Sequence, residues 1–289
     1  MIERRAIDAI PPPFLVLGGV ASTQFGASFA KGLFDDVGPG GTVFLRMLLA
    51  ALVLAALWRP SIRRHTRGDL LLVLGFGVAL AAMNLTFYEA IDRIPLGVAV
   101  TLEFAGPLTV AVLGSRRALD LVWVTLAAAG ILLLADLGGS GIDALGAVLA
   151  LLAGVFWGSY ILLSERVGQV FPGGAGLALA MLVGAVLLLP VGVVGAGGAL
   201  LDARVLAVGT LVAMMSSAIP YSLELEALRR LPSGVFGVLM STEPAMAALA
   251  GLVVLGEGLA AREAVAIGLV VVASAGAARR AAREAVPRD

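Results

Sequence analysis

Two glutamates that stand close to prolines in long apolar stretches are the residues of this sequence best placed to do chemistry. Glu103 lies four residues before Pro107, and Glu243 directly precedes Pro244. An ionisable group near the centre of a bilayer costs about 2.5–3.5 kcal/mol on insertion scales, so it normally faces a cavity or a partner. Each proline also leaves a carbonyl one turn earlier without its helical donor. A carboxylate near such a carbonyl can bind a proton or an ammonium group.

Arg46 is the one basic residue inside an apolar stretch, and it has no charged neighbour in the sequence. We expect it to pair with a carboxylate from another helix, and the depth of Glu103 and Glu243 makes these two the candidates. The alternative is a buried pair that only fixes the packing of helices. Further residues near mid-depth either line a path or bond neighbouring helices, and these are Gln24, Asn84, Tyr88, Trp157, Tyr160, Ser216, Ser217 and Tyr221.

The remaining acids and the single lysine are expected where water reaches them. Glu89, Glu224 and Glu226 lie near the predicted ends of helices. Lys31 ends a predicted helix, and its long side chain is expected to extend outward from the apolar region.

The sequence lacks residues that several classes of protein need. It has no cysteine and one histidine, which excludes thiolate and histidine-cluster metal centres. The only lysine follows an alanine, so the sequence contains no P-loop. A net charge of zero gives no indication of a nucleic-acid partner. No nucleophile–base pair points to an enzyme, and we expect no catalytic residue, cofactor or metal.

The composition sets the environment in which these residues must work. Of the 289 residues, 60% are hydrophobic and 14% are charged, whereas a soluble domain carries about 25% charged residues. Lipid must therefore be the outer solvent. A bilayer-crossing helix needs about 20 mostly apolar residues, and ten stretches of this kind are 14–33, 40–58, 70–90, 95–114, 119–137, 143–163, 174–195, 203–227, 232–255 and 261–278.

The distribution of basic residues orients these ten predicted helices, because positively charged loops stay in the cytoplasm. With both termini inside, fifteen of the twenty Lys and Arg residues fall in inner segments. The outer loops hold only Lys31, Arg93, Arg204 and Arg262. Inverting the arrangement would reverse this ratio. The sequence therefore predicts that both termini are cytoplasmic.

An internal repeat divides the chain into two parts. Residues 89–98 match residues 226–235 in the pattern Glu-Ala-x-x-Arg-x-Pro, and Pro107 falls on Pro244 at the same separation. Each part holds five predicted helices, an odd number, so the two copies must face opposite ways in the membrane. We therefore predict an all-α integral membrane protein of ten transmembrane helices in two inverted five-helix repeats, residues 1–137 and residues 138–289, the second with a short basic C-terminal tail. Inverted repeats are typical of secondary transporters.

Several stretches of the chain resemble the EamA-type branch of the drug/metabolite transporter superfamily, and within it the threonine/homoserine exporters of bacterial inner membranes. They are residues 26–34, 95–108, 115–117, 221–224, 231–244 and 255–257. The most specific is Leu-Glu-Phe-x-Gly-Pro-Leu at residues 102–108. The Leu-Gly-Glu motif at residues 255–257 is generic to the superfamily.

The resemblance implies a multi-pass inner-membrane carrier that exports threonine, homoserine or similar amino acids, driven by the proton gradient. The alternative is export of another metabolite or drug, because relatives in this superfamily carry purines, sugars, drugs and diverse amino acids. The expected partners are the amino acid, protons and membrane lipid, and the oligomeric state is left open. A zwitterionic amino acid needs a cation and an anion, which Arg46 with Glu103 or Glu243 would supply.

Overall fold

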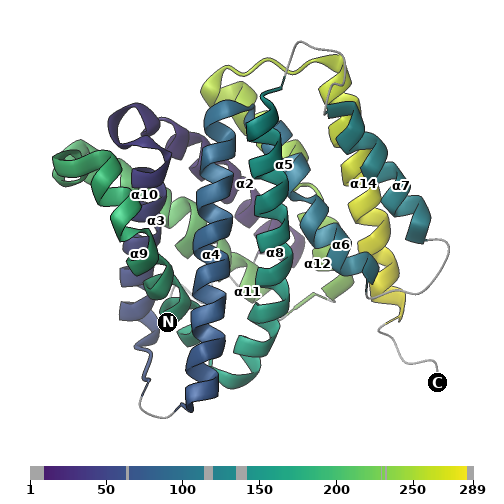
Figure 1. The fold of residues 1–289 in the computed structure, drawn as a ribbon. Helices are drawn as coiled ribbons and strands as arrows, with labels where there is room; N and C mark the ends of the chain where they lie inside the picture. The colour runs from purple at the N-terminus through teal and green to yellow at the C-terminus, as the bar shows by residue number, and fades with distance from the viewer. Residues whose placement is uncertain are drawn as a thin grey trace.

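The computed structural model describes residues 10–62, 65–113, 120–134, 142–228, 230–231 and 233–284. Within these ranges the chain forms helices and turns and no β-strand. Figure 1 shows the helices gathered into one bundle, with α4 and α8 side by side at its centre and α7 beside α14 at one edge.

The elements follow one another along the chain as α2 (Pro12–Lys31), α3 (Phe34–Trp58), α4 (Arg67–Arg93), α5 (Leu96–Glu103), α6 (Ala105–Leu113), α7 (Asp120–Leu134), α8 (Ala144–Val170), α9 (Ala175–Ala196), the 3-10 helix η1 (Gly197–Leu201), α10 (Ala203–Ala213), the π-helix η2 (Met214–Ala218), α11 (Ile219–Leu228), α12 (Ser233–Met240), α13 (Glu243–Ala250), the π-helix η3 (Gly251–Leu255) and α14 (Ala261–Glu284).

Each of the ten stretches predicted from hydropathy coincides with one helix or with consecutive helical segments. By length and composition, six helical runs can cross a membrane, namely residues 34–58, 67–93, 144–170, 175–201, 203–221 and 235–255. Two shorter apolar runs, Leu96–Val110 and Val122–Leu133, accompany them. The chain therefore folds as an all-helical, multi-pass membrane protein, and ten crossings stay a prediction.

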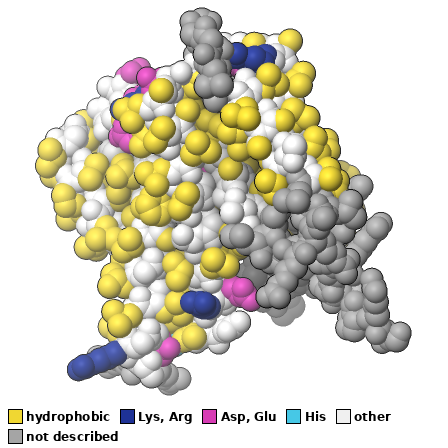
Figure 2. Space-filling model, turned by 45° about the vertical axis from the view of Figure 1, so that its right-hand side comes forward, with side chains coloured by type: hydrophobic (Ala, Val, Ile, Leu, Met, Phe, Trp, Pro, Cys, Tyr) yellow, Lys and Arg dark blue, Asp and Glu magenta, His cyan; other side chains and the backbone are white. Residues whose placement is uncertain are grey.

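The surface of the bundle is apolar, as a lipid-facing protein requires. Large aliphatic side chains stand fully outward, among them Val194, Val186 and Leu57. Figure 2 shows hydrophobic side chains over the middle of one face, while charged side chains lie toward its top and bottom. An exposed apolar area of this extent would promote aggregation in water, whereas in a bilayer it faces acyl chains.

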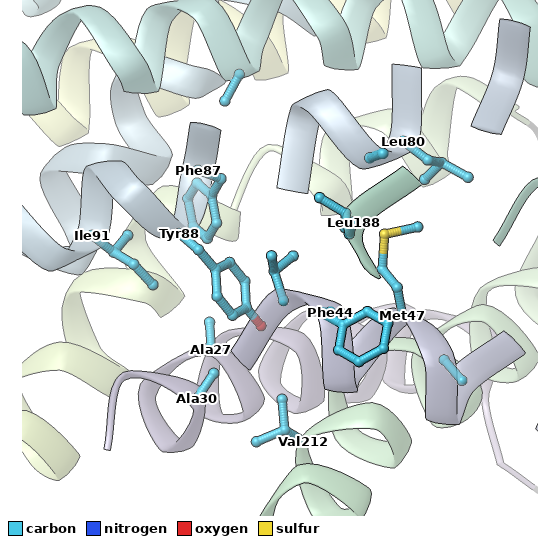
Figure 3. Packing of buried hydrophobic residues seen from close by; sticks show 14 of the residues in the cluster. Ala27, Ala30, Phe44, Met47, Leu80, Phe87, Tyr88, Ile91, Leu188 and Val212 are labelled. Atoms are coloured by element: carbon cyan, nitrogen blue, oxygen red, sulfur yellow. The ribbon is translucent and has the colours of Figure 1, made fainter. Parts of the chain in front are cut away.

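The interior is packed from aromatic, aliphatic and small side chains. In Figure 3, Phe87, Tyr88 and Ile91 lie on α4, and the Tyr88 ring projects from α4 toward α2 and α3. Small residues lie near it, with Ala27 and Ala30 on α2. Small residues let transmembrane helices approach closely where lipid gives no hydrophobic drive for association.

Two of the predicted spans are interrupted at mid-length. The stretch 95–114 is split into α5 and α6 at Phe104, and the stretch 232–255 is split into α12 and α13 at residues 241–242. Both interruptions lie within three residues of a proline, Pro107 or Pro244. A proline lacks the N–H that would continue the helical ladder, which explains why both helices break there.

Candidate functional site

A cavity of about 600 Å³ lies at the level of the two helix breaks. Residues from α2, α3, α4, α5, α6, α8, α11, α12, α13 and α14 line it, together with Ser216 of η2. The wall carries one guanidinium, from Arg46, and three carboxylates, from Glu103, Glu224 and Glu243. The rest of the wall is largely apolar and aromatic.

Glu103 is the last residue of α5 and lies directly before the first break. Pro107, four residues later, cannot donate to the carbonyl of Glu103. Gly154 of α8 packs against this main chain so closely that a Cβ at residue 154 would lie 2.5 Å from the carbonyl oxygen of Glu103. The side chain of Glu103 is 8% exposed, lines the cavity, and makes no hydrogen bond or ion pair within the described part of the chain. Its carboxylate is therefore available to a ligand.

Glu243 is placed differently, because it begins the helix that follows the second break. It is the first residue of α13, and Pro244 occupies the next position, where helices tolerate proline well. Gln24 of α2 donates from Nε2 to Oε2 of Glu243 at 3.4 Å. Both side chains are buried and both line the cavity. Glu103 thus lies before its helix break and has no side-chain donor, whereas Glu243 lies after its break and accepts from the amide of Gln24.

Arg46 of α3 is held by neutral oxygens. Its Nη1 donates to the hydroxyl of Tyr88 at 3.2 Å, and its Nη2 donates to the carbonyl of Ser216 at 3.2 Å. Pro220 stands four residues after Ser216 and has no N–H to offer this carbonyl. The carbonyl is therefore left for Arg46.

The expected ion pair between Arg46 and a glutamate is absent from the described residues. A guanidinium carries five N–H donors, and the bonds to Tyr88 and Ser216 use only part of them. Arg46 lines the cavity and is 9% exposed, so an anion that entered the cavity could accept from its remaining donors.

The structure brings most of the predicted site residues together. Eight of them line the cavity, namely Gln24, Arg46, Asn84, Glu103, Trp157, Tyr160, Tyr221 and Glu243. Tyr88 lies behind Arg46 and does not line it, and Ser217 is buried outside the lining. Ser216, the neighbour of Ser217, contributes to the wall instead.

The aromatic wall is held by ring contacts. Trp157 meets Phe104 edge-on, with ring centroids 5.2 Å apart, and Tyr160 stacks on Phe76 at 5.2 Å. Such pairs add about 0.5–1.5 kcal/mol beyond the burial of their area. The rings of Trp157 and Tyr160 are therefore fixed features of the cavity.

Glu224 is a cavity-lining carboxylate that the sequence analysis did not include among the site candidates. Its position near the end of a predicted helix suggested a solvated side chain, yet it lines the cavity. It follows Tyr221 by three residues on α11, and residues three apart share one face of a helix. The three-residue spacing from Tyr221, a predicted site residue, was therefore the signal in the sequence that could have placed Glu224 in the site.

One end of the bundle, which we call the closed end, is sealed around Leu96, Lys31 and Glu257. Glu257 accepts a hydrogen bond from the backbone N–H of Leu96 at 2.9 Å and an ion-pair contact from Nζ of Lys31 at 2.7 Å. Residues 96–102 of α5 are all fully buried. Lys31 therefore has a specific partner at this end, and the outward extension of its side chain stays a prediction. In Figure 1 this end is at the top, where the connection to α14 lies.

The opposite end, which we call the open end, is reached through the cavity. Ser164 also lines the cavity. It follows Trp157 by seven residues on α8 and so lies about 10 Å nearer the end of that helix. Glu224 lines the cavity on α11, and both residues keep partial exposure. The cavity thus extends from the level of the breaks toward the end at which α8 finishes.

Comparison with known proteins agrees with this geometry. The EamA-like transporter family matches residues 11–135 and again residues 144–279. The threonine/homoserine exporter RhtA of Escherichia coli is 45% identical over 267 residues, covering 92% of this chain and 90% of the relative. RhtA of Salmonella typhimurium is 44% identical over 275 residues, covering 94% and 93%. A solved crystal structure that is 20% identical matches in fold, with a TM-score of 0.63 over 93% of this chain and 98% of that one. The chain belongs to the EamA-like transporter family.

Proposed function

We propose that this protein is a secondary carrier of the inner membrane that exports threonine, homoserine and similar small amino acids in exchange for protons. The proposal includes ten spans in two inverted five-helix repeats, residues 1–137 and 138–289, with both termini and the open end in the cytoplasm. Support comes from the relatives, which are named for threonine and homoserine export. The observation that carries it is the set of one guanidinium and three carboxylates around a single cavity.

These charges suit a zwitterion. The free N–H donors of Arg46 can bind a carboxylate, since charge-assisted bonds from arginine to a carboxylate are among the strongest in proteins. The ammonium group of the same amino acid then binds Glu243, whose carboxylate is oriented by the hydrogen bond from Gln24. Both poles of an amino acid would be satisfied in an apolar surrounding, where an unpaired charge is costly.

The excess of carboxylates over arginine favours coupling to protons. Three carboxylates share the cavity with one guanidinium, and buried negative charges of this kind must be met by cations. An ammonium group meets one of them and a proton can meet another. We assign the proton to Glu103, because its side chain faces the cavity and has no hydrogen-bond or ion-pair partner in the described part of the protein.

Efflux from proteoliposomes loaded with labelled homoserine or threonine tests the proposal. The wild type should release label faster than empty liposomes, and an inward proton gradient should increase the rate. Glu103→Gln should abolish the response to the gradient but keep homoserine–homoserine exchange, since glutamine resembles the protonated acid. Glu243→Gln and Arg46→Gln should reduce efflux and exchange together.

Glu89→Gln is the matched control, because Glu89 pairs with Arg93 at a helix end and does not line the cavity. Its efflux should equal that of the wild type. Wild-type efflux no faster than that of empty liposomes, with correctly folded protein, would refute amino-acid export.

A second candidate substrate is a larger amphiphilic metabolite or drug. The cavity volume of about 600 Å³ falls in the range of about 300–1,000 Å³ that is usual for drug-sized ligands, and aromatic rings form much of the wall. Competition separates the two candidates. Unlabelled homoserine should inhibit labelled homoserine efflux at lower concentration than any aromatic cation, and the reverse order would favour the second candidate.

A further inference from the structure

We propose that Asn84 is the residue that recognises the side-chain hydroxyl of the transported amino acid, and so selects hydroxylated substrates over apolar ones of the same size. The inference rests on the proposed function and adds the residue that sets its specificity. Asn84 lies in the middle of α4, is 5% exposed, and lines the cavity.

A hydrogen bond fixes the orientation of the Asn84 amide. Its Nδ2 donates to the carbonyl of Leu80, one turn earlier, at 2.8 Å. A carbonyl can only accept, so the nitrogen of the amide must face Leu80. The oxygen Oδ1 therefore points to the other side, away from the carbonyl that holds the nitrogen. In the described part of the chain no donor reaches this oxygen.

Asn84 differs in this respect from three other cavity-wall residues, Gln24, Ser216 and Ser274, that also hold an unpartnered polar atom. Gln24 Oε1, Ser216 Oγ and Ser274 Oγ also lack partners, but neighbouring atoms cover all three completely. Asn84 Oδ1 is not covered in this way, so the small exposed surface of Asn84 belongs to the cavity. A buried acceptor without a donor costs about 1–3 kcal/mol. A substrate that brings a donor would remove that cost.

The position of Asn84 fits the anchoring of the substrate at Arg46. Tyr88, which binds Nη1 of Arg46, follows Asn84 by four residues on α4. Residues at this spacing lie on one face of a helix, about 6 Å apart along its axis. An amino acid whose carboxylate is bound by Arg46 therefore carries its side chain into the neighbourhood of Asn84.

The immediate surroundings of Asn84 favour discrimination. Met83 and Phe87, its neighbours on the same part of α4, line the cavity with apolar surface. An analogue with a methyl group in place of the hydroxyl would leave Oδ1 without a donor and displace water from it. Sites that hydrogen-bond a substrate hydroxyl reject the analogue that lacks it far more strongly than apolar pockets discriminate by size.

Paired substrates test the inference in proteoliposomes. Homoserine is compared with norvaline, and threonine with valine, as competitors of labelled homoserine exchange, because each apolar partner carries a methyl group in place of the hydroxyl. The wild type should prefer the hydroxylated member of each pair by about tenfold or more. Asn84→Leu, which keeps the volume but removes the acceptor, should bring both preferences to within about twofold of unity. Asn84→Asp, which keeps an acceptor oxygen, should retain most of the preference.

Thr86→Val is the matched control. Thr86 is on the same helix, its hydroxyl bonds to the carbonyls of Ala82 and Met83, and it does not line the cavity. The preference ratios should not change in this variant. If Asn84→Leu does not fold, Asn84→Ala carries the same prediction, and homoserine should then raise the melting temperature of the wild type more than that of the variant.

The outcomes separate the inference from the proposed function. Homoserine exchange in the wild type with unchanged preference ratios in Asn84→Leu or Asn84→Ala would overturn the role of Asn84 and leave amino-acid export standing. Absence of any homoserine or threonine exchange in the wild type would overturn both.

Discussion

The closed end and the open end of this bundle are both bordered by the broken helices, yet they differ in packing. At the closed end, α5 lies against α13, and a Cβ on Gly97 would come within 2.7 Å of the Cα and Cβ of Ala248. Toward the open end, α6 and α12 border the cavity, which Leu108 and Phe236 line. The same pair of broken helices therefore seals the protein on one side of the breaks and encloses space on the other.

The proposed inverted repeat gives this difference a functional meaning. The repeat pairs α5 with α12 and α6 with α13, so the sealed pair, α5 with α13, is equivalent to the open pair, α12 with α6. Exchange of the two packings would close the cavity at one end and open it at the other. This is how inverted repeats produce alternating access around a fixed central site.

The two ends also differ in their charges. Leu255 and Gly256 precede Glu257 of the closed end, whereas in the first half of the chain Leu113 and Gly114 precede Ser115. The ion pair of Glu257 with Lys31, which we call the latch, thus uses a carboxylate that Ser115 cannot supply. We expect the two facing states to differ in stability for that reason.

The largest effect should come from preventing closure at the closed end. Gly97→Val places a branched side chain against the backbone of Ala248, where the helices have no room for it. Overpacking of this kind costs about 1–3 kcal/mol, so substrate efflux should fall about tenfold or more. Labelled homoserine efflux measures the change.

Gly75→Val is the control for that substitution. Gly75 is also in a transmembrane helix, α4, and a Cβ at that position would meet no atom within 4 Å. Its efflux should match the wild type. Equal efflux in Gly97→Val and wild type would show that the tight contact between α5 and α13 is not needed for transport.

A smaller effect should follow from breaking the latch. Glu257→Gln removes the ion pair with Lys31, whose two side chains are 24% and 16% exposed. A partly exposed pair contributes about 1 kcal/mol at most, so the closed end should open more readily by a factor of at most about five. A single cysteine at Val98, which is 1% exposed, should then react faster with a maleimide.

Two further variants sharpen the interpretation of the latch. Lys31→Gln should have the same effect as Glu257→Gln, and the double variant should add little, because both remove one interaction. Arg204→Gln removes a more exposed pair with Asp36, 71% and 31% exposed, and should leave labelling unchanged. Additive effects of Lys31→Gln and Glu257→Gln would argue against a shared latch.

The smallest effect is expected at the level of the breaks, where neither end is altered. Tyr88→Phe removes one hydrogen bond to Arg46, which contributes about 1 kcal/mol. The KM for homoserine should rise about fivefold, while maleimide labelling at both ends stays as in the wild type. A change in labelling without a change in KM would assign Tyr88 to helix packing and not to the support of Arg46.

Much of the helical layout and part of the site could be predicted from the sequence, for physical reasons. Apolar stretches of about 20 residues cannot stay in water, so they mark helices. Glu103 and Glu243 stood out because a carboxylate is rare in such a stretch. The structure places both in one cavity.

The contacts between distant residues could not be predicted in this way. Lys31 and Glu257 are 226 residues apart, and no local pattern joins them. Arg46 lacks the expected carboxylate partner because a carbonyl that Pro220 cannot bond, together with the Tyr88 hydroxyl, already satisfies part of it. Such neutral partners leave no signature in the distribution of charge.

The most direct test of the account uses a single cysteine in the cavity, which is possible because the chain has none of its own. Ser164→Cys places a thiol in the cavity wall toward the open end. In inside-out membrane vesicles, a membrane-impermeant maleimide should label it, and saturating homoserine should slow that labelling at least severalfold. Labelling only from right-side-out vesicles, or labelling that homoserine does not slow, would contradict a cytoplasm-facing cavity that binds the exported amino acid.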